Sequence, residues 1–348
     1  MTAPGRKSSA PFEGDTDVVL SSRVRLARNL SAFPFVNRAS HAQRREVVDT
    51  VRSVPLCTPS APKVSWMDMG ELATRDRQLL VERHLVSRQF IEGDSPRALA
   101  VAPDETLAIM VNEEDHLRLQ SMQSGSDLAT AYENAMALDD ALSAHLDFAY
   151  SATLGYLTAC PTNVGCGIRL SVMVNMRALR LSHEIERVQR AAKDLHLAVR
   201  GFYGEGSEAI GDWFQISNQR TLGVREEDLV ADFTQRIVPT VVAYEREARR
   251  LMLERSRTAV EDRVYRAMAV LRTARLMTME EAMKHLSAVR MGVCLGLIQD
   301  VTLAKLNALT VDLQPAHLRA AHPTVDSDEA EREARARAAR LSLGEIRL

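Results

Sequence analysis

The stretch Leu107-Ala-Ile-Met-Val-Asn-Glu-Glu-Asp-His-Leu-Arg118 runs from an apolar, strand-like segment directly into three consecutive acids. Upstream, Ala98 to Ala102 is a second apolar segment, and the turn-like Pro-Asp-Glu-Thr separates the two. Two short apolar segments on either side of such a turn are typical of a β-hairpin. We therefore expect an antiparallel component in the fold, with the acids at the end of one of its strands.

Strand-like and helical segments alternate on both sides of this hairpin. Apolar residues that recur at steps of three or four predict one helix, and a second helix of this kind covers Glu184 to Leu197. The residues of the first are Leu128, Ala131, Ala135, Leu138, Leu142 and Leu146. Arg169 to Asn175, Leu197 to Tyr203 and Trp213 to Asn218 are strand-like, and turns that contain glycine separate them. The alternation predicts an α+β fold.

Beyond about Glu226 the strand pattern disappears, and helical periodicity dominates from Leu229 to Val270. Thr278-Met-Glu-Glu281 is a capping box that opens another helix, and Gly292 is available to end it. Asp326 to Arg340 alternates Glu, Ala and Arg, which predicts a solvated helix. We expect a flexible leader over residues 1–15, an α+β domain over 16–254 and a helical domain over 255–348.

The bulk composition is that of an ordinary globular protein, with 46% hydrophobic and 26% charged residues. A net charge of −2 provides no field that attracts nucleic acid or an anionic membrane. No apolar segment approaches the roughly 20 residues of a membrane span, and the N-terminus lacks the apolar region of a signal peptide. We expect a cytoplasmic protein that binds neither nucleic acid nor membrane.

Arginine and cysteine usage adds little by itself. Of the 44 basic residues only five are lysines, which either a GC-rich genome or a need for planar phosphate contacts explains. Cys57, Cys160, Cys166 and Cys294 form no C-x-x-C pair and predict reduced thiols rather than a zinc site or a disulfide framework. The usual nucleotide signatures, a P-loop or a strand-linked G-x-G-x-x-G, are absent from the sequence.

Four polar segments in apolar surroundings are the candidates for chemistry. In Leu20-Ser-Ser-Arg-Val-Arg, strand alternation places Arg23 and Arg25 on one face, which suits a polyphosphate. A surface strand with solvated arginines is the plainer interpretation of that segment alone. The acids that follow Val111 are explained equally by a solvated turn, although Arg118 beside them adds a group that binds phosphate.

The other two segments are rich in glycine. In Tyr156 to Ser171, Cys160 precedes a proline in a turn, where a thiol is exposed more readily, and we take Cys166 as an inert buried thiol. In Val199-Arg-Gly-Phe-Tyr-Gly-Glu-Gly-Ser-Glu208, glycines allow close approach of a ligand. Taken alone, that segment is also explained as a loop with a salt bridge.

In this order and spacing, NEEDHLR, CPTNVG and RGFYGEGSE resemble the signature blocks of the phosphagen (ATP:guanido) kinase family, and most closely those of its bacterial protein-arginine kinases. The resemblance runs from about Val18 to about Gly223. Weaker similarity continues through Glu261 to Arg266 and Gln314 to His317. It implies a catalytic domain with an antiparallel sheet flanked by helices, followed by a helical C-terminal domain.

The resemblance also implies a role for individual residues. Five arginines grip the phosphates of ATP, and His84 contacts the nucleotide; the arginines are Arg23, Arg25, Arg118, Arg169 and Arg200. The backbone around Arg169 to Met173 and Arg200 to Glu205 would complete the nucleotide site, to which Ser21, Ser22 and Val24 also belong. The residues of the two backbone stretches are Leu170, Ser171, Val172, Met173, Gly201, Phe202, Tyr203, Gly204 and Glu205. Mg²⁺ is expected to bridge the phosphates, and no protein residue is predicted as a metal ligand.

By the same resemblance, Glu114 and Glu205 hold the substrate guanidinium, and Cys160 assists its orientation. A guanidinium has a pKa of roughly 12.5 to 13.8, so its nitrogen attacks only when it is oriented and relieved of a proton. Two carboxylates supply that alignment, and one accepts the proton. The implied reaction is direct transfer of the ATP γ-phosphoryl group.

Only about 20 residues precede the Ser-Ser-Arg-Val-Arg segment, whereas kinases of small guanidino compounds carry a helical domain there. An open site that admits arginine side chains of proteins is therefore expected, with links to stress response and proteolysis. The partners implied are protein substrates, an activator of the McsA type, Clp protease components and a second copy in a homodimer. The alternatives are a kinase of free arginine or a related metabolite, and a catalytically silent adaptor that binds arginine or phosphoarginine.

One departure concerns regulation. The related kinases carry an R-D-x-x-R-A motif near the C-terminus that binds phosphoarginine, and the nearest string here is Glu333-Ala-Arg-Ala-Arg-Ala338. Only Arg337-Ala338 matches its second half. The resemblance thus leaves open whether this chain senses phosphoarginine.

Overall fold

The computed structural model describes residues 14–56, 63–201, 210–325 and 327–346 of the chain. Their strands form one eight-stranded sheet and one small hairpin. The strands of the sheet are β1 (Val19–Arg28), β2 (Ser65–Asp68), β3 (Ala98–Val101), β4 (Leu107–Val111), β5 (Leu117–Ser124), β8 (Ile168–Asn175), β9 (Leu197–Gly201) and β10 (Trp213–Asn218), and β6 (Tyr150–Ser151) pairs with β7 (Gly155–Tyr156).

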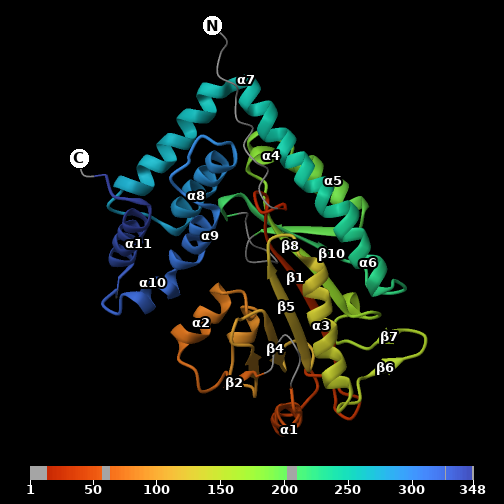
Figure 1. Cartoon of the computed structure of the whole chain (residues 1–348). Helices are drawn as coiled ribbons and strands as arrows, with labels where there is room; N and C mark the ends of the chain where they lie inside the picture. The colour runs from red at the N-terminus through yellow and green to blue at the C-terminus, as the bar shows by residue number, and fades with distance from the viewer. Residues whose placement is uncertain (1–13, 57–62, 202–209, 326, 347–348) are drawn as a thin grey trace.

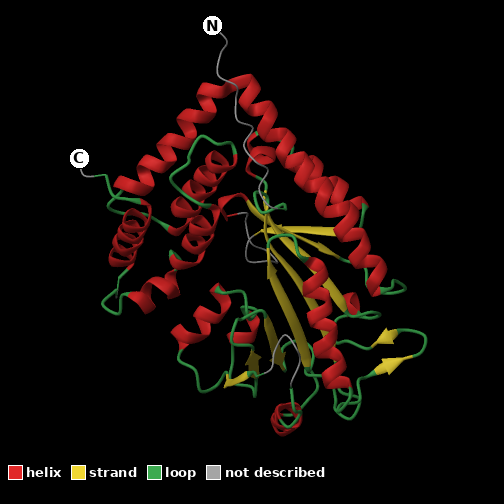
Figure 2. Ribbon diagram, in the orientation of Figure 1, coloured by secondary structure: helices red, strands yellow, loops and turns green. Residues whose placement is uncertain are grey.

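The sheet has the order β2-β3-β4-β5-β1-β8-β10-β9, and every neighbouring pair is antiparallel. β3 and β4 pair as the predicted hairpin, with Ala98 opposite Val111. The long strand β1 lies in the centre between β5 and β8. An antiparallel sheet flanked by helices is confirmed as the fold class (Figure 2).

Helices pack on both faces of the sheet, because alternate strand residues on one face and Leu99, Val101, Ala108 and Met110 of β3 and β4 on the other face belong to buried apolar clusters. α3 (Leu128–Ser143) lies along β1 and β5, and its Leu128, Ala131, Ala135, Leu138 and Leu142 are buried, as the periodicity predicts (Figure 1). The other helices of this part are α1 (His41–Arg52), α2 (Thr74–Glu82), α4 (Arg177–Leu181) and α5 (Ile185–Asp194), with short turns η1 (Gln89–Ile91), η2 (Pro161–Asn163) and η3 (Ile210–Asp212).

The C-terminal part is helical, as expected. Its elements are α6 (Glu226–Asp232), the π-helix η4 (Phe233–Ile237), α7 (Val238–Thr273), α8 (Met279–Cys294), α9 (Leu303–Asp312), α10 (Pro315–Ala321) and α11 (Asp328–Leu343). Figure 1 shows α7 as two arms that meet at an angle above the sheet. The bend coincides with Ser256, whose φ of −151° and ψ of 53° are not helical.

The C-terminal helices share a core with the sheet. One continuous cluster of buried apolar residues contains Val24 and Leu170 of the sheet together with Val264 of α7 and Leu286 of α8. Arg249 of α7 adds a buried ion pair to Asp17 at 3.0 Å. A division of the chain near residue 255 stays a prediction.

The expectation that Gly292 ends a helix is wrong. Thr278 does cap α8, since its side chain accepts a hydrogen bond from the Glu281 backbone, but the helix continues past Gly292 to Cys294. A Cβ atom at Gly292 would lie 2.3 Å from Cγ1 of Val264, so glycine is required there for close packing of α8 on α7.

The expectation that the last helix is solvated is also wrong. α11 buries Ala336 and Ala339 completely, because small side chains allow it to approach α7 and α8. Arg335 is 1% exposed and donates to the backbone carbonyls of Leu313 at 2.8 Å and Met277 at 3.2 Å. The repeated Glu and Arg residues concealed an apolar alanine face. Among the helices that the structure describes, none combines the length and apolar character of a membrane span.

Candidate active site

A cleft of about 350 Å³ lies on the sheet face opposite α3. Charged side chains from β1, β5, β8 and β9 form its floor, and the segment after α2 forms one wall. The side chains that line it are Arg23, Arg25, Val81, His84, Val86, Ser87, Arg88, Gln89, Met110, Glu113, Glu114, Arg118, Gln120, Cys160, Thr162, Asn163, Arg169, Arg200 and Gln215.

All five predicted arginines line this cleft, because strand register places them on one face. Arg25 is opposite Arg169 across the β1–β8 pair. Arg118 lies opposite Ala27 in the β1–β5 pair, and Arg200 lies opposite Gln215 in the β10–β9 pair. Residues separated by up to 177 positions in the sequence thus form a single cationic floor.

The guanidinium groups of the floor repel one another, and this repulsion favours the binding of an anion. Burial and the neighbouring guanidinium groups of Arg118 and Arg169 lower the pKa of Arg23 to about 10. Burial and the same type of like-charge contact also lower the pKa of Arg25, whose Nε atom has no hydrogen-bond partner among the described residues. An anion with several oxygens would relieve this repulsion and supply the missing acceptors.

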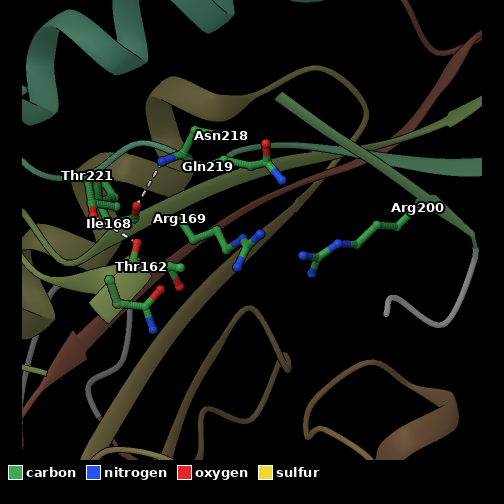
Figure 3. A pocket seen from close by; sticks show the side chains of 8 residues that line it. Thr162, Ile168, Arg169, Arg200, Asn218, Gln219 and Thr221 are labelled. Carbon is green, nitrogen blue, oxygen red and sulfur yellow. Dashed lines mark hydrogen bonds between the residues drawn. The ribbon is translucent and has the colours of Figure 1, made fainter. Parts of the chain in front are cut away.

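Figure 3 shows the edge of this floor, where the guanidinium groups of Arg169 and Arg200 point toward one another. Both side chains also line a smaller adjoining hollow of about 100 Å³. Asn218 fixes the strand beneath it, since its side chain accepts from the Leu170 backbone at 2.8 Å and donates to the Ile168 carbonyl at 3.1 Å. These two hydrogen bonds hold the backbone of Ile168 and Leu170 and thereby fix the position of Arg169, which lies between them.

Glu113, which the sequence did not single out, organises the rim of the cleft. Its Oε1 atom accepts from Arg118 Nη1 at 2.6 Å and from Ser87 Oγ at 2.6 Å, and its Oε2 atom accepts from the Glu114 backbone at 2.9 Å. Burial alone would raise the pKa of Glu113, but these partners outweigh burial and hold the pKa below its ordinary value. Glu113 therefore stays ionised and holds Arg118 in place.

Glu114 is placed differently from its neighbour. Its side chain is 42% exposed and lies 3.9 Å from Arg118, and the Cys160 thiol lines the same cleft. Burial, together with the charges of Asp115 and Glu113, raises the pKa of Glu114. An exposed carboxylate with a raised pKa and free acceptor capacity is suited to bind a cation and to accept its proton.

The rest of the NEEDHLR segment holds these two acids. Asp115 is buried and accepts from Asn29 Nδ2 and from the Ala159 backbone, both at 2.6 Å, so it ties the Cys160 segment to the turn. His116 accepts from the Leu30 backbone through Nδ1 at 3.0 Å and donates from Nε2 to the Pro34 carbonyl at 2.9 Å. Polar residues that looked like a solvated turn are in fact a set of internal anchors.

Several predicted nucleotide residues face away from the cleft. Val24, Leu170 and Val172 are buried in the apolar core, and Ser22 donates to the Gly125 carbonyl at 2.7 Å on the same side. Alternation makes this unavoidable, since each stands between two residues that face the cleft. Any contact of these four residues with the nucleotide would therefore come from the backbone, and their assignment to the nucleotide stays a prediction.

The other predicted nucleotide residues fall into three groups. Ser171 and Met173 lie on the cleft face, where the Ser171 hydroxyl accepts from Arg23 at 3.4 Å, and Ser21 is opposite Met173. His84 is part of the cleft wall, and burial together with Arg23 lowers its pKa to about 4. Gly201 ends β9, and Phe202, Tyr203, Gly204 and Glu205 lie outside the described residues.

The structure adds side chains that sequence analysis missed. Gln215 accepts from Arg23 at 2.9 Å, and Ser87 joins the cleft wall to Glu113. Alternation along Trp213-Phe-Gln-Ile-Ser217 could have pointed to Gln215, because its neighbours Phe214 and Ile216 face the core. No sequence signal joins Ser87 to Glu113, since they are 26 residues apart. Cys166 is buried, as expected for an inert thiol.

Two family models match the chain, one for each part. The model of the ATP:guanido phosphotransferase C-terminal catalytic domain matches residues 47–248, and the model of the protein-arginine kinase McsB C-terminal domain matches residues 257–347. The chain therefore belongs to the ATP:guanido phosphotransferase family, as its antiparallel sheet and arginine-lined cleft indicate. Its relatives within that family are named protein-arginine kinases.

The Protein-arginine kinase of Symbiobacterium thermophilum is 46% identical over 308 residues, which are 87% of this chain and 86% of that protein. The one of Halalkalibacterium halodurans is 40% identical over 342 residues, 98% of this chain and 95% of that protein. A solved structure, the duplicated taurocyamine kinase from Schistosoma mansoni with bound transition state analog components, matches with a TM-score of 0.61 at 26% identity. That match covers 69% of this chain and 35% of the duplicated protein.

Proposed function

We propose that this protein is a protein-arginine kinase, which transfers the γ-phosphoryl group of ATP to arginine side chains of proteins. The observation that carries the proposal is the position of Glu114, a partly exposed carboxylate at the edge of a floor of five arginines. A carboxylate there binds a guanidinium while the floor binds phosphates. Both family matches and the names of the relatives support the same activity.

ATP is assigned to the arginine floor. Arg23, Arg25, Arg118, Arg169 and Arg200 would hold its phosphates, with His84 and Ser171 as further contacts. The described residues contain no group of three or more His, Cys, Asp or Glu side chains placed to hold a metal ion. We therefore assign Mg²⁺ to the phosphates of ATP, where it would neutralise charge on the group being transferred.

The acceptor guanidinium is assigned to Glu114 and Glu205, with Cys160 beside them. Glu114 can align the guanidinium through two hydrogen bonds, and its raised pKa suits it to take the proton that the attacking nitrogen must lose. Glu205 lies outside the described residues, and its role rests on the sequence resemblance. The arginines hold the phosphates in line, so positioning and charge neutralisation drive the transfer.

We also propose the finer assignments that the resemblance implies. They are a cytoplasmic location, a homodimer, an activator of the McsA type and delivery of phosphorylated proteins to Clp components.

Sensing of phosphoarginine through the degenerate C-terminal string gains no support from Arg335, whose guanidinium is already bound to two backbone carbonyls. Arg337, by contrast, is exposed.

The test is ATP-dependent modification of an acceptor protein, followed by mass spectrometry at neutral pH, because phosphoarginine is labile in acid. We expect phosphate on arginine residues of the acceptor. Free arginine in a parallel assay separates the two kinds of substrate. Much faster phosphorylation of free arginine than of any protein would favour a small-molecule kinase, and the absence of both products would favour a silent adaptor.

A further inference from the structure

A buried carboxylate lies where the C-terminal helices meet the wall of the cleft. Glu82 ends α2, and α10 begins beside it (Figure 1). The Oε1 atom of Glu82 accepts from the Ala316 backbone at 2.8 Å, and its Oε2 atom accepts from the His317 backbone at 3.0 Å. A glutamate of the catalytic part thus caps the N-terminus of a C-terminal helix, where orphan N–H groups and the helix dipole favour an anion.

The His317 side chain completes this junction. Its Nδ1 atom lies 2.6 Å from Glu82 Oε2, and its Nε2 atom lies 3.4 Å from Nε of Arg83. Because arginine is only a donor, His317 Nε2 accepts, and its proton is therefore on Nδ1 and faces Glu82. Arg83 also pairs with Glu105 at 2.8 Å, which fastens the junction to the β3–β4 hairpin.

The residue after Arg83 turns directly into the cleft. His84 has a φ of 59° and ends α2 in a Schellman motif, with its N–H donating to Val81 at 2.9 Å and that of Leu85 to Leu80 at 3.0 Å. The backbone carbonyl of His84 accepts from Gln120 of β5 at 2.8 Å. The position of the His84 side chain is therefore set by the end of α2.

Three residues further on, Ser87 reaches the rim of the cleft. Its hydroxyl donates to Glu113, which in turn holds Arg118 and the backbone of Glu114. The His84 turn is thus held on both sides by hydrogen bonds of 3.0 Å or less. Before the turn, Glu82 accepts from the backbone of α10, and after it, Ser87 donates to Glu113. The wall of the cleft is held by the C-terminal helices at one end and by Glu113 at the other.

We infer that Glu82 is a positioning residue for phosphoryl transfer, and that the C-terminal helices hold the His84–Ser87 wall of the cleft in place through α10. Glu82 does not line the cleft itself. It acts through the end of α2, because loss of the cap frees the segment that carries His84 and Ser87. This inference rests on the proposed function in one respect, which is that ATP occupies the cleft.

A second buried glutamate provides a matched control. Glu245 of α7 caps α4 by accepting from the Ala178 backbone at 3.0 Å and the Leu179 backbone at 3.1 Å, as Glu82 does for α10. Arg249 pairs with Glu245 at 2.8 Å. None of these residues lines the cleft. The two glutamates therefore share the structural role and differ in what they position.

The experiment compares Glu82→Gln, Glu82→Ala and His317→Ala with Glu245→Gln in the full-length chain, at a temperature where each variant is folded by circular dichroism. We expect all four to lower Tm, since each removes a hydrogen-bonding group that joins two elements. Only the Glu82 and His317 variants should lose kcat/KM for ATP, by roughly 10- to 100-fold for Glu82→Ala, as expected for misplaced binding groups. Glu82→Gln should lose less, because its amide keeps one acceptor oxygen.

Calorimetric titration with ATP, without an acceptor protein, separates this inference from the proposed function. Weaker ATP binding by the Glu82 variants with unchanged binding by Glu245→Gln supports the positioning role, whatever the acceptor turns out to be. Equal ATP binding and equal kcat/KM in all folded variants, with lowered Tm, would show that Glu82 is a stabilising cap only. If Glu82→Ala fails to fold, Glu82→Gln and His317→Ala decide the question. Inactive wild-type protein that still binds ATP would overturn the proposed function alone.

Discussion

At the centre of the eight-stranded sheet, the two faces are made from the same strands and carry opposite kinds of side chain. On the face toward α3, Val24 and Leu26 of β1 are fully buried in the apolar core. On the other face, Arg23 and Arg25 of the same strand line the cleft with Arg169 of β8. Alternation along the strand thus assigns neighbouring residues to stability and to chemistry.

The two faces also contribute to the free energy of folding with opposite signs. Apolar burial stabilises the fold at about 25 cal/mol per Å² removed from water. The arginine face works against it, because burial and like charges lower the pKa of Arg23 and Arg25. The apolar face therefore maintains a set of charges that an anion relieves when it binds, so binding and activity are expected to respond to one face and stability to the other.

The largest expected effect is on activity, from a change at the rim of the cleft. In the proposed mechanism Glu114 aligns the guanidinium and accepts its proton, so Glu114→Gln should lower kcat about 10²- to 10⁴-fold. Stability should hardly change, because the Glu114 side chain is 42% exposed. The measurement is the initial rate of protein-arginine phosphorylation together with thermal unfolding.

The control is Glu133→Gln on α3, an exposed acid remote from the cleft, which should keep full activity. A pH profile adds an independent check. Since the pKa of Glu114 is raised, activity should be complete above that pKa and fall as pH drops through it, at a higher pH than an ordinary carboxyl would give. Retained activity in Glu114→Gln would remove Glu114 from the mechanism.

A second pair of variants tests the contrast between the faces within one strand. Leu26→Ala should lower the free energy of unfolding by about 2 to 5 kcal/mol, because it leaves a cavity in the core, and leave the KM for ATP unchanged in the folded protein. Arg25→Met should raise the KM for ATP without loss of stability, since it removes a desolvated like charge and keeps the apolar stem. Urea unfolding and ATP-dependent initial rates measure both.

The contrast fails if the two variants behave alike. Loss of stability in Arg25→Met equal to that in Leu26→Ala would mean that Arg25 is a packing residue. Unchanged ATP affinity in Arg25→Met would mean that the arginine floor does not bind phosphates.

The sequence was most informative where periodicity and residue type agree. The α3 stripe, the β3–β4 hairpin and the shared face of Arg23 and Arg25 follow from local patterns, and the structure has them where they were expected. Glu114 and Cys160 came from the motif resemblance, and both line the cleft. Functional residues that belong to short, contiguous motifs can be identified from the sequence in this way.

Contacts between distant segments could not be predicted from the sequence. Glu113 looked like a solvated acid because its partner Ser87 belongs to another element, and the buried alanine face of α11 was hidden by its Glu and Arg content. The contiguous motifs of the resemblance include inward-facing residues of β1 and β8, whereas only alternate residues of a strand present side chains to the cleft. Burial and long-range pairing decide these cases, and one sequence shows neither.

The smallest expected effect concerns His84. Like the arginines of the sheet, His84 lies in the cleft at some cost in stability, but it belongs to the wall after α2. A position at φ 59° after a helix favours glycine, and a larger residue there costs of order 1 kcal/mol. With a pKa of about 4, His84 is neutral at pH 7, so it adds no charge beside Arg23 and offers ATP a neutral ring. His84→Gly should stay within about 1 kcal/mol of the wild type in free energy of unfolding, because relief of strain offsets the flexibility of glycine. Its KM for ATP should rise about 2- to 10-fold, the worth of one neutral hydrogen bond. A less stable variant with unchanged KM would instead make His84 a packing residue, and would leave the arginine floor to bind ATP without the wall.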